Sequence, residues 1–305
     1  MSDTSASYPA AQPGLFTEPG NQAHYLEFVV SAGVSDQALK QALSGGLAHG
    51  ANCYVALAFS SSAWDRLQPS WRPQDLQPFA TLQGKYTMPA TQTDLLFWIH
   101  AEDRGEVMAA VLHIHRCMAD VAEIKNDISG FKNSESRDLT GFVDGTANPK
   151  EDGRIPVAQI APGQPGAGGS YVFAQLWQHH LKEFNQLPVT DQERVIGRTK
   201  GDNIEMEGDA MPADSHVSRT DVKVDGVGMK IYRRSTPYYR SAEDHGLYFI
   251  CFACELRRIS IQLERMAGMT EDGLSDHLMK YSTPTTGNYW FMPAQHDLEQ
   301  LLQAG

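Results

Sequence analysis

The spacing of hydrophobic and polar residues predicts alternating strands and helices in the first half of the chain. Two segments, 35–49 and 103–118, are interpreted as helices, and Ser35 and Asp36 stand where they would cap the first one. Four short apolar or alternating runs are typical of strands: 24–30, 52–60, 94–100 and 121–131. The predicted order of strand, helix, strand, strand, helix, strand is that of a ferredoxin-like domain.

The second half is interpreted as a repeat of this scheme, although no visible sequence identity links the two halves. The pattern predicts strands at 171–178, 227–235 and 247–256, and helices at 178–185 and 257–268. The polar, turn-rich segment 197–218 is predicted to be an ordered loop across a bound ligand rather than a helix. We therefore expect an α+β fold in which helices flank antiparallel sheets.

The charge of the chain argues against a nucleic-acid partner. Its 305 residues include 37 acidic and 25 basic side chains, which gives a formal net charge of −12. Lys and Arg form no run longer than a pair, whereas a nucleic-acid surface requires concentrated positive charge. The longest apolar stretches, 248–253 and 94–99, are too short to span a bilayer, so we expect no membrane segment.

The N-terminus and the cysteines predict a location inside the cell. Residues 1–20 are rich in Ser, Ala, Pro and Gly and lack the apolar run of a signal peptide, so we expect a flexible lead and no export. Four cysteines in a chain of this size suit a reducing compartment and argue against a disulfide framework. The cytoplasm is the expected location.

The segment Gly141-Phe142-Val143-Asp144-Gly145 places one carboxylate between two glycines. Glycine allows backbone angles and close approaches that a Cβ resists, so the chain can fold tightly around Asp144 and lie against a flat ligand. The same pattern fits an ordinary Asp-Gly turn, which is among the commonest turn sequences. From the residues alone, both interpretations stay open.

An arginine lies on an apolar face of the predicted strand 227–235. Strand alternation places Arg233 on the same face as Met229, Ile231 and Ser235. A guanidinium is costly to bury unless an anionic or polar group meets it. Arg233 therefore requires a partner, in either a plain salt bridge or a functional site.

Three motifs in this order resemble the dye-decolorizing peroxidase family: Gly-Phe-Val-Asp-Gly-Thr at 141–146, Asp-Ser-His-Val-Ser-Arg around His216, and Tyr-Arg-Arg-Ser around Arg233. The resemblance covers nearly the whole chain and is closest to the P-type (formerly B-type) bacterial branch. It implies two ferredoxin-like domains of the dimeric α+β barrel type, at 21–140 and 141–305, with haem b in the second. Members commonly form dimers or larger rings, so a homo-oligomer is expected.

The resemblance implies which residues hold the haem. His216 would be the axial ligand of the iron and leave the other axial position open for peroxide. Asp276 is the candidate acceptor for the second ring nitrogen of His216, although it equally fits a helix-surface acid. Arg198, and after it Arg219, would bind the propionates, although Arg198 also fits a solvated residue. The turn after Val143 would add contacts from Asp144, Gly145, Thr146, Ala147 and Asn148.

The neighbouring strands would line the pocket. Ile231 on one strand and Leu247 and Phe249 on the next present apolar faces that suit a haem wall. A purely structural core would show the same faces. Ser235 would orient the distal water or peroxide.

The implied reaction reduces hydrogen peroxide to water and oxidises small phenols, dyes or other aromatic donors through a ferryl intermediate. Asp144 would accept a proton from bound peroxide and return it to the departing oxygen. Arg233 would stabilise the negative charge that develops as the O–O bond breaks. Because aspartates ordinarily titrate at about 3.9, activity weighted toward acidic pH is expected.

Three other functions are weighed against this one. A haem-handling protein would store or transfer porphyrin, or release its iron, with only incidental peroxidase activity. Chlorite dismutases and coproheme decarboxylases share the broad fold but lack the Gly-x-x-Asp-Gly turn, so Asp144 argues against them. A haem-free interaction module would make the three motifs coincidental.

Overall fold

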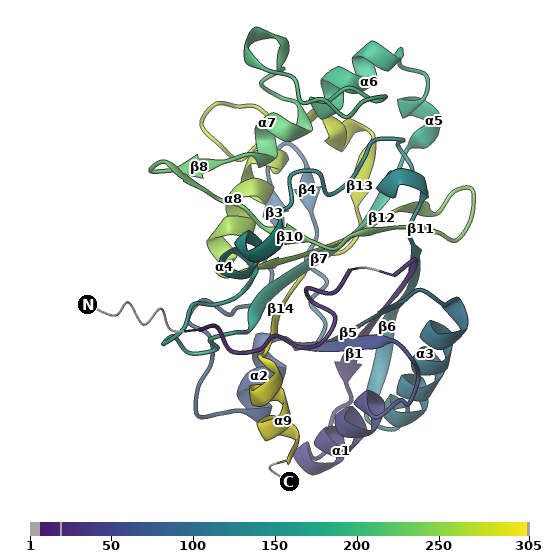
Figure 1. Cartoon of the computed structure of the whole chain (residues 1–305), viewed down its shortest axis with the longest axis vertical. Coiled ribbons are helices and arrows are strands. Elements are labelled where there is room, and N and C mark those ends of the chain that lie inside the picture. The colour runs from purple at the N-terminus through teal and green to yellow at the C-terminus, as the bar shows by residue number, and fades with distance from the viewer. Residues whose placement is uncertain (1–6, 19, 304–305) are drawn as a thin grey trace.

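The computed structural model describes residues 7–18 and 20–303 of the chain (Figure 1). The expected N-terminal lead, 1–20, therefore lies partly outside the described residues. Its described part packs against the sheet, because Gln12 donates from Nε2 to the carbonyl oxygens of Leu57 (2.8 Å) and Pro293 (3.1 Å). Residues 7–18 are thus not the loose extension that the composition predicts.

The first half of the chain contains all the elements predicted for it, with ends that agree within two residues. Ser35 caps the first helix by accepting a hydrogen bond from the Ala38 amide, and Asp103 caps the third through the Glu106 amide. In chain order the elements are β1 (Gln22–Val30), α1 (Asp36–Leu47), β2 (Tyr54–Phe59), α2 (Ser61–Leu67), β3 (Leu82–Gln83), β4 (Thr87–Met88), β5 (Leu95–Ala101), α3 (Arg104–Met118) and β6 (Ala122–Phe131).

The second half has more and shorter elements than its pattern predicts. They are α4 (Ile155–Ala158), β7 (Ser170–His179), α5 (Leu181–Phe184), α6 (Val189–Ile196), α7 (His216–Thr220), β8 (Lys223–Val224), β9 (Val227–Gly228), β10 (Tyr232–Arg233), β11 (Thr236–Tyr239), β12 (His245–Ala253), α8 (Leu256–Ala267), β13 (Ser282–Pro284), β14 (Asn288–Met292) and α9 (Gln295–Gln303). None of the helices in the described ranges is both long and apolar enough to cross a bilayer.

The strand predicted at 227–235 is interrupted. Positive φ angles at Asp225 (49°) and Gly226 (80°) turn the chain, so β9 pairs with β8 in a hairpin. Only β10 joins the main sheet, where Tyr232 and Arg233 pair with β12. The face predicted from alternation nevertheless holds locally, because Tyr232 and Arg234 are buried while Arg233 is partly exposed.

Two further predictions need correction. The helix predicted at 178–185 is wrong at its start, because β7 runs on to His179 through pairing with Ser282 of β13, and only α5 is helical. The loop predicted at 197–218 ends in a helix, because Ser215 caps α7 and His216 is its first residue. The pairing of β7 with β13 therefore sets the end of that strand, and the cap at Ser215 sets the start of α7.

The main sheet closes on itself. Its strand order is β10-β12-β11-β6-β1-β5-β2-β14-β7-β13, and an additional antiparallel pairing of β12 with β7 joins the ends into a barrel-like ring. The two halves of the chain meet where β11 pairs with β6 and β14 with β2, each through a single residue pair in register. The α+β class with antiparallel sheet is therefore confirmed.

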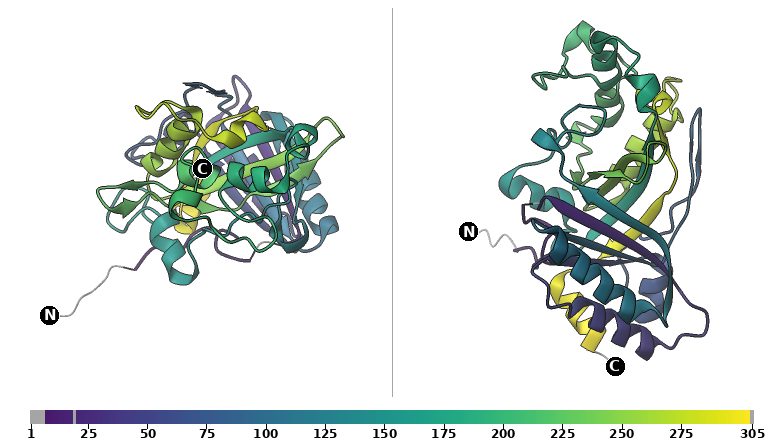
Figure 2. Two further views of the ribbon diagram at one scale, coloured as in Figure 1. Left: turned by 90° about the horizontal axis from the view of Figure 1, so that it is seen from above. Right: turned by 90° about the vertical axis from the view of Figure 1, so that its right-hand side faces the viewer.

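The helices gather at opposite ends of this ring. In Figure 1, α1, α3 and α9 lie at one end of the molecule and α5, α6 and α7 at the other. The right-hand view of Figure 2 shows the same separation along the long axis.

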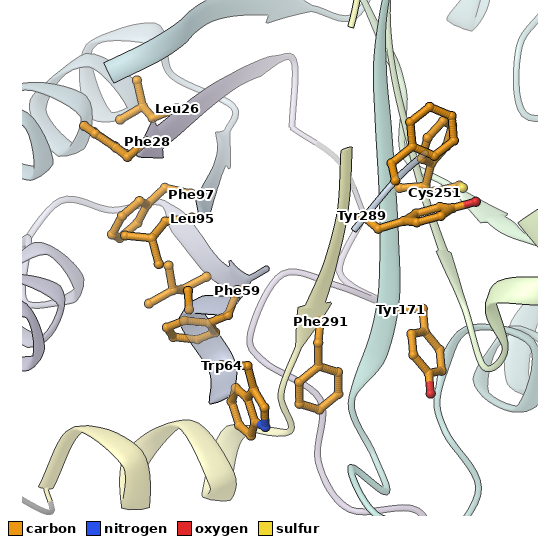
Figure 3. Close-up of a cluster of buried hydrophobic side chains, with 14 of the residues drawn as sticks. Leu26, Phe28, Phe59, Trp64, Leu95, Phe97, Tyr171, Cys251, Tyr289 and Phe291 are labelled. Atoms are coloured by element: carbon orange, nitrogen blue, oxygen red, sulfur yellow. The ribbon is translucent and has the colours of Figure 1, made fainter. Parts of the chain in front are cut away.

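Strand alternation divides the apolar residues of the main sheet into two cores. The outer core packs beneath the helices and includes Phe28, Phe97 and Phe291, which Figure 3 shows with their neighbours. The inner core fills the ring with other side chains of the same strands, such as Trp98 and Tyr248. Strand β5 is apolar except for His100, is buried on both faces and serves both cores.

Candidate functional site

A cavity of about 250 Å³ lies in the second half of the chain. All of its lining residues fall between Asp138 and Ser282, so none of them comes from the elements β1 to β6. The cavity brings together Asp144, His216 and Arg233, which lie far apart in the sequence.

A tight turn presents Asp144 to the cavity. Gly141 (φ 88°) and Gly145 (φ 81°) adopt left-handed angles that favour glycine, as their positions predict. A Cβ on Gly141 would also lie 2.7 Å from the Cε atom of Lys200. The Asp144 amide donates to the Ser136 carbonyl (2.9 Å), and Oδ1 accepts from the Gly145 amide (2.6 Å). The backbone of the turn is thus tied to Ser136, and the carboxylate is held by the amide of the residue that follows it.

Asn148 joins this turn to the strand that carries Arg233. The Arg233 amide donates to Oδ1 of Asn148 (2.9 Å), and Nδ2 of Asn148 donates to the Arg233 carbonyl (2.8 Å). In addition to these two hydrogen bonds, Nη1 of Arg233 lies 3.6 Å from Oδ1 of Asp144. The partner that Arg233 requires is therefore Asp144, and both side chains keep about a quarter of their surface exposed.

His216 is held by a buried carboxylate. Its Nδ1 lies 2.6 Å from Oδ2 of Asp276, which is fully buried at 0% exposure. The other oxygen of Asp276 accepts from the Leu278 amide at 2.9 Å. A carboxylate accepts hydrogen bonds, so Nδ1 is the donor of this bond and Nε2 is the ring nitrogen left for another contact. Among the described residues, Nε2 has no hydrogen-bond partner, and His216 lines the cavity.

The cavity walls are largely apolar. Ile231, Leu247 and Phe249 line it as the alternation predicts. Helix α8 adds one of its faces to the cavity lining through Ile259, Leu263 and Met266. A flat apolar ligand therefore finds side chains suited to it.

Strand β7 contributes a cavity face that the sequence interpretation missed. Gln175, Trp177 and His179 line the cavity and alternate with residues of the inner core. Period-two spacing within the predicted strand is the signal that could have identified them. The amide oxygen and nitrogen of Gln175 are buried and, among the described residues, have no hydrogen-bond partner. A buried amide without partners fits a site that a ligand or water completes.

Asp138 is a second missed residue of the cavity wall. Its Oδ1 lies 3.1 Å from Nε2 of His179, and its Oδ2 accepts from the hydroxyl of Thr140 at 2.6 Å. Burial alone would raise the pKa of Asp138, but the charge and hydrogen bond of His179, together with the bonds from Thr140, hold this pKa well below its usual range. Asp138 is therefore an ionised anchor for the turn that carries Asp144.

The two predicted propionate ligands lie in different surroundings. Arg198 lines the cavity, and its guanidinium contacts Glu205 and the Asn203 carbonyl. Arg219 does not line the cavity and is only 1% exposed. Its guanidinium faces the turn after α8, where it binds Asp272 at 2.6 Å. The placement of Arg219 near a haem propionate is therefore corrected.

The remaining predicted residues divide between two neighbouring cavities. Thr146 and Ala147 line the first cavity with Asp144. Gly145, Asn148 and Ser235 line a second cavity beside it. The Ser235 hydroxyl accepts a weak hydrogen bond from the Ile250 amide at 3.3 Å.

The donor set of the first cavity fits a haem. It offers one imidazole with a free Nε2, apolar walls, and an acid and a guanidinium beside each other. A neutral imidazole whose other nitrogen donates to a carboxylate is a common axial ligand of iron. The described residues contain no group of three or more His, Cys, Asp or Glu side chains arranged to hold a bare metal ion.

Comparison with known proteins decides the family. A family model described as Dyp-type peroxidase, C-terminal, matches residues 135–297, and one described as Dyp-type peroxidase, N-terminal, matches residues 12–132. The chain belongs to the Dyp-type peroxidase family. It is therefore an enzyme of a class of haem peroxidases.

Relatives support this membership over nearly the whole length of the Dyp-type chain. A dye-decolorizing peroxidase of Rhodococcus erythropolis is 33% identical over 310 residues, which covers 95% of this chain and 89% of the relative. A solved Dyp-type peroxidase from Shewanella oneidensis has a TM-score of 0.91 at 32% identity and covers 98% of this chain and 100% of its own. A variant of DypB from Rhodococcus jostii RHA1 in complex with heme has a TM-score of 0.88 at 31% identity, with coverages of 96% and 99%.

Proposed function

We propose that this Dyp-type peroxidase binds haem b, reduces hydrogen peroxide to water and oxidises small aromatic donors. The observation that carries the proposal is that one cavity holds both a carboxylate-oriented imidazole, His216, and the Asp144–Arg233 pair. A solved relative in complex with heme supports the same cofactor here. When bound, haem would supply the redox chemistry, passing electrons from the donor to peroxide.

His216 is proposed as the axial ligand through Nε2. Asp276 would fix the ring orientation and raise the basicity of the imidazole, because the proton on Nδ1 is shared with a fully buried carboxylate. Ile231, Leu247 and Phe249 would contact the macrocycle. Arg198 remains the proposed propionate partner, with further contacts from Thr146 and Ala147.

Asp144 is proposed to move the proton of peroxide. Its carboxylate accepts a hydrogen bond from the Gly145 amide and reaches the cavity, so it would accept a proton from one peroxide oxygen and deliver it to the other. Arg233 would stabilise the negative charge on the departing oxygen, an effect typically worth about 3 kcal/mol. Ser235 is proposed to orient a water or peroxide from the adjoining cavity.

Three finer expectations remain part of the proposal. The division into ferredoxin-like domains at 21–140 and 141–305 is supported by the antiparallel order β6-β1-β5-β2 in the first half and by the position of the cavity in the second. A cytoplasmic location is supported by the four free cysteines. The partners are proposed to be hydrogen peroxide, an aromatic donor and further copies of the chain. The comparisons do not favour the haem-handling alternative.

Oxidation of a small phenol or dye by peroxide tests the proposal. We expect steady turnover by haem-loaded enzyme, and a loss of about 100-fold in Arg233→Ala with its haem retained. Arg257→Ala is the matched control, because Arg257 is exposed on α8 and pairs with Glu264 outside the cavity. Turnover that is unchanged in Arg233→Ala, together with haem that passes readily to an apo-acceptor, would favour haem handling instead.

A further inference from the structure

The charged side chains that line the first cavity are paired with one another. The lining contains three Arg or Lys side chains and four carboxylates. Among the lining residues that the structure describes, each of these cations has a carboxylate of the same cavity as its partner. The pairs are Arg198 with Glu205, Lys230 with Asp221 (2.6 Å) and Arg233 with Asp144 (3.6 Å), while the fourth carboxylate, Asp138, contacts His179.

This charge balance matters for haem, because the macrocycle carries propionate groups that are anions at neutral pH. With its histidines neutral, the lining has one more negative than positive side chain. A further carboxylate that enters such a lining is repelled unless it takes a cation from the acid that holds it. Binding of a propionate therefore exchanges one ion pair for another.

The pair of Arg198 and Glu205 is the one best suited to this exchange. The Arg198 side chain keeps 12% of its surface exposed, whereas that of Glu205 keeps 42%. The carboxylate can thus turn into water at little cost, while the guanidinium stays at the cavity. In the pair of Lys230 and Asp221, both side chains are more than 40% exposed, so water already screens their attraction.

The backbone around Arg198 and Glu205 is held in place. The two residues are partners in an antiparallel bridge of the hairpin that follows α6 (Figure 1). Nη1 of Arg198 donates to the Asn203 carbonyl (3.1 Å), and Nδ2 of Asn203 donates to the Thr146 hydroxyl (2.7 Å), which ties the hairpin to the turn that carries Asp144. Arg198 can therefore change partners by a movement of the Glu205 side chain alone.

We infer that Glu205 competes with a haem propionate for Arg198 and thereby limits how tightly the cavity retains haem. The inference rests on the proposed haem-binding function. Glu205 offers the guanidinium an alternative partner at every moment, so a propionate gains only the difference between the two ion pairs. Removal of the charge of Glu205 should therefore strengthen the retention of haem. No covalent bond changes in this exchange.

Transfer of haem from the loaded enzyme to apomyoglobin measures the retention. We expect Glu205→Gln to lose haem about 3- to 10-fold more slowly than the unaltered enzyme, because the amide keeps the size of the side chain but not its charge. Glu205→Asp keeps the charge but is shorter by one methylene, so its rate should fall between the two. Glu264→Gln is the matched control and should leave the rate unchanged, because Glu264 pairs with Arg257 (3.0 Å) outside the cavity and its loss changes the net charge equally.

A haem whose propionates are methyl esters separates competition from a general change in the structure. The ester has no anion to offer Arg198, so we expect Glu205→Gln and the unaltered enzyme to lose it at equal rates. In an Arg198→Gln background, the Glu205 substitution should likewise leave the loss of ordinary haem unchanged.

Two results would overturn the inference while the proposed function stands. One is loss of ordinary haem from Glu205→Gln that is as fast as, or faster than, loss from the unaltered enzyme. A faster loss would mean that Glu205 positions Arg198 for the propionate. The other is an equal slowing with the esterified haem. An unaltered enzyme that binds no haem, and so shows no Soret band, would overturn the proposed function and the inference together.

Discussion

Nη1 of Arg233 lies 3.6 Å from Oδ1 of Asp144, and Asn148 bonds to the Arg233 backbone in both directions. The separation exceeds that of a good hydrogen bond, so each group keeps capacity to bind a third partner. An oxygen between them would meet a proton acceptor and a cation together. This arrangement suits the proposed cleavage of peroxide.

Asp144→Asn tests the proton-transfer step. The amide preserves the size of the side chain and an oxygen for the Gly145 amide, but it cannot accept the peroxide proton. We expect kcat/KM for peroxide to fall by about 10²- to 10⁴-fold with haem content unchanged. Stopped-flow mixing with peroxide measures this rate. A near-normal rate in the variant, or an optimum above neutral pH in the unaltered enzyme, would argue against Asp144 as the base.

Asn148→Ala tests the positioning of Arg233. Removal of both bonds frees the backbone that carries the guanidinium, so we expect the rate with peroxide to fall about 10-fold while haem stays bound. Asn148→Asp keeps one acceptor for the Arg233 amide and should restore part of the rate. Asn185→Ala, at an exposed position outside both cavities, is the control. A loss of thermal stability without any change in the peroxide rate would mean that Asn148 is only structural.

Asp276→Asn tests the support of His216. The variant retains an acceptor for the Leu278 amide but loses the charge beside Nδ1. We expect haem affinity to fall about 10- to 100-fold and the reduction potential to rise, because the imidazole becomes a poorer electron donor. Transfer of haem to an apo-acceptor and a redox titration measure the two effects. Asp214→Asn, two residues before His216, is the matched control, and equal behaviour of the two variants would contradict the assignment.

The buried histidine His100 should make the folded protein less stable in acid. Burial, with a smaller contribution from the charge of Arg234, lowers the pKa of His100 to about 4. An unfolded histidine titrates at about 6.5, so between these values the unfolded chain binds a proton that the folded chain does not. The free energy of unfolding should therefore fall by about 3 kcal/mol from pH 7 to pH 4.

Urea unfolding across this pH range, compared with His100→Gln, measures the contribution. We expect the variant to lose most of the dependence between pH 6.5 and pH 4. Parallel curves for the two proteins would show that other groups cause the acid sensitivity.

The first half of the fold could be predicted from sequence because its signals are local. Its strands are apolar or alternating runs, and its helices α1 and α3 begin at the caps Ser35 and Asp103. Nearby residues therefore set the ends of these elements. The second half depends on distant pairings, such as that of His179 with Ser282, which extends a strand past its local pattern. Strands β13 and β14 were not predicted for the same reason. Helix α6 was missed although Pro188 before it and Gly197 after it are local signals of its ends.

The site was predictable to the extent that its residues belong to motifs. Asp144, His216 and Arg233 meet in one cavity, and the proposed contact of Asp276 with His216 is present at 2.6 Å. Arg219 is held by an ion pair with Asp272, which lies 53 residues further along the chain, and no local pattern predicts a contact at that separation. Gln175 lies in a strand whose alternation was visible in the sequence, but no motif identified it as a residue of the site.

The central claim is that His216 binds haem iron through Nε2, and the absorption spectrum of His216→Ala tests it most directly. Protein loaded with haem should show a ferric Soret band, and the variant should bind haem weakly or show a shifted band that added imidazole restores. A variant that keeps haem with the Soret band unaltered would contradict the account.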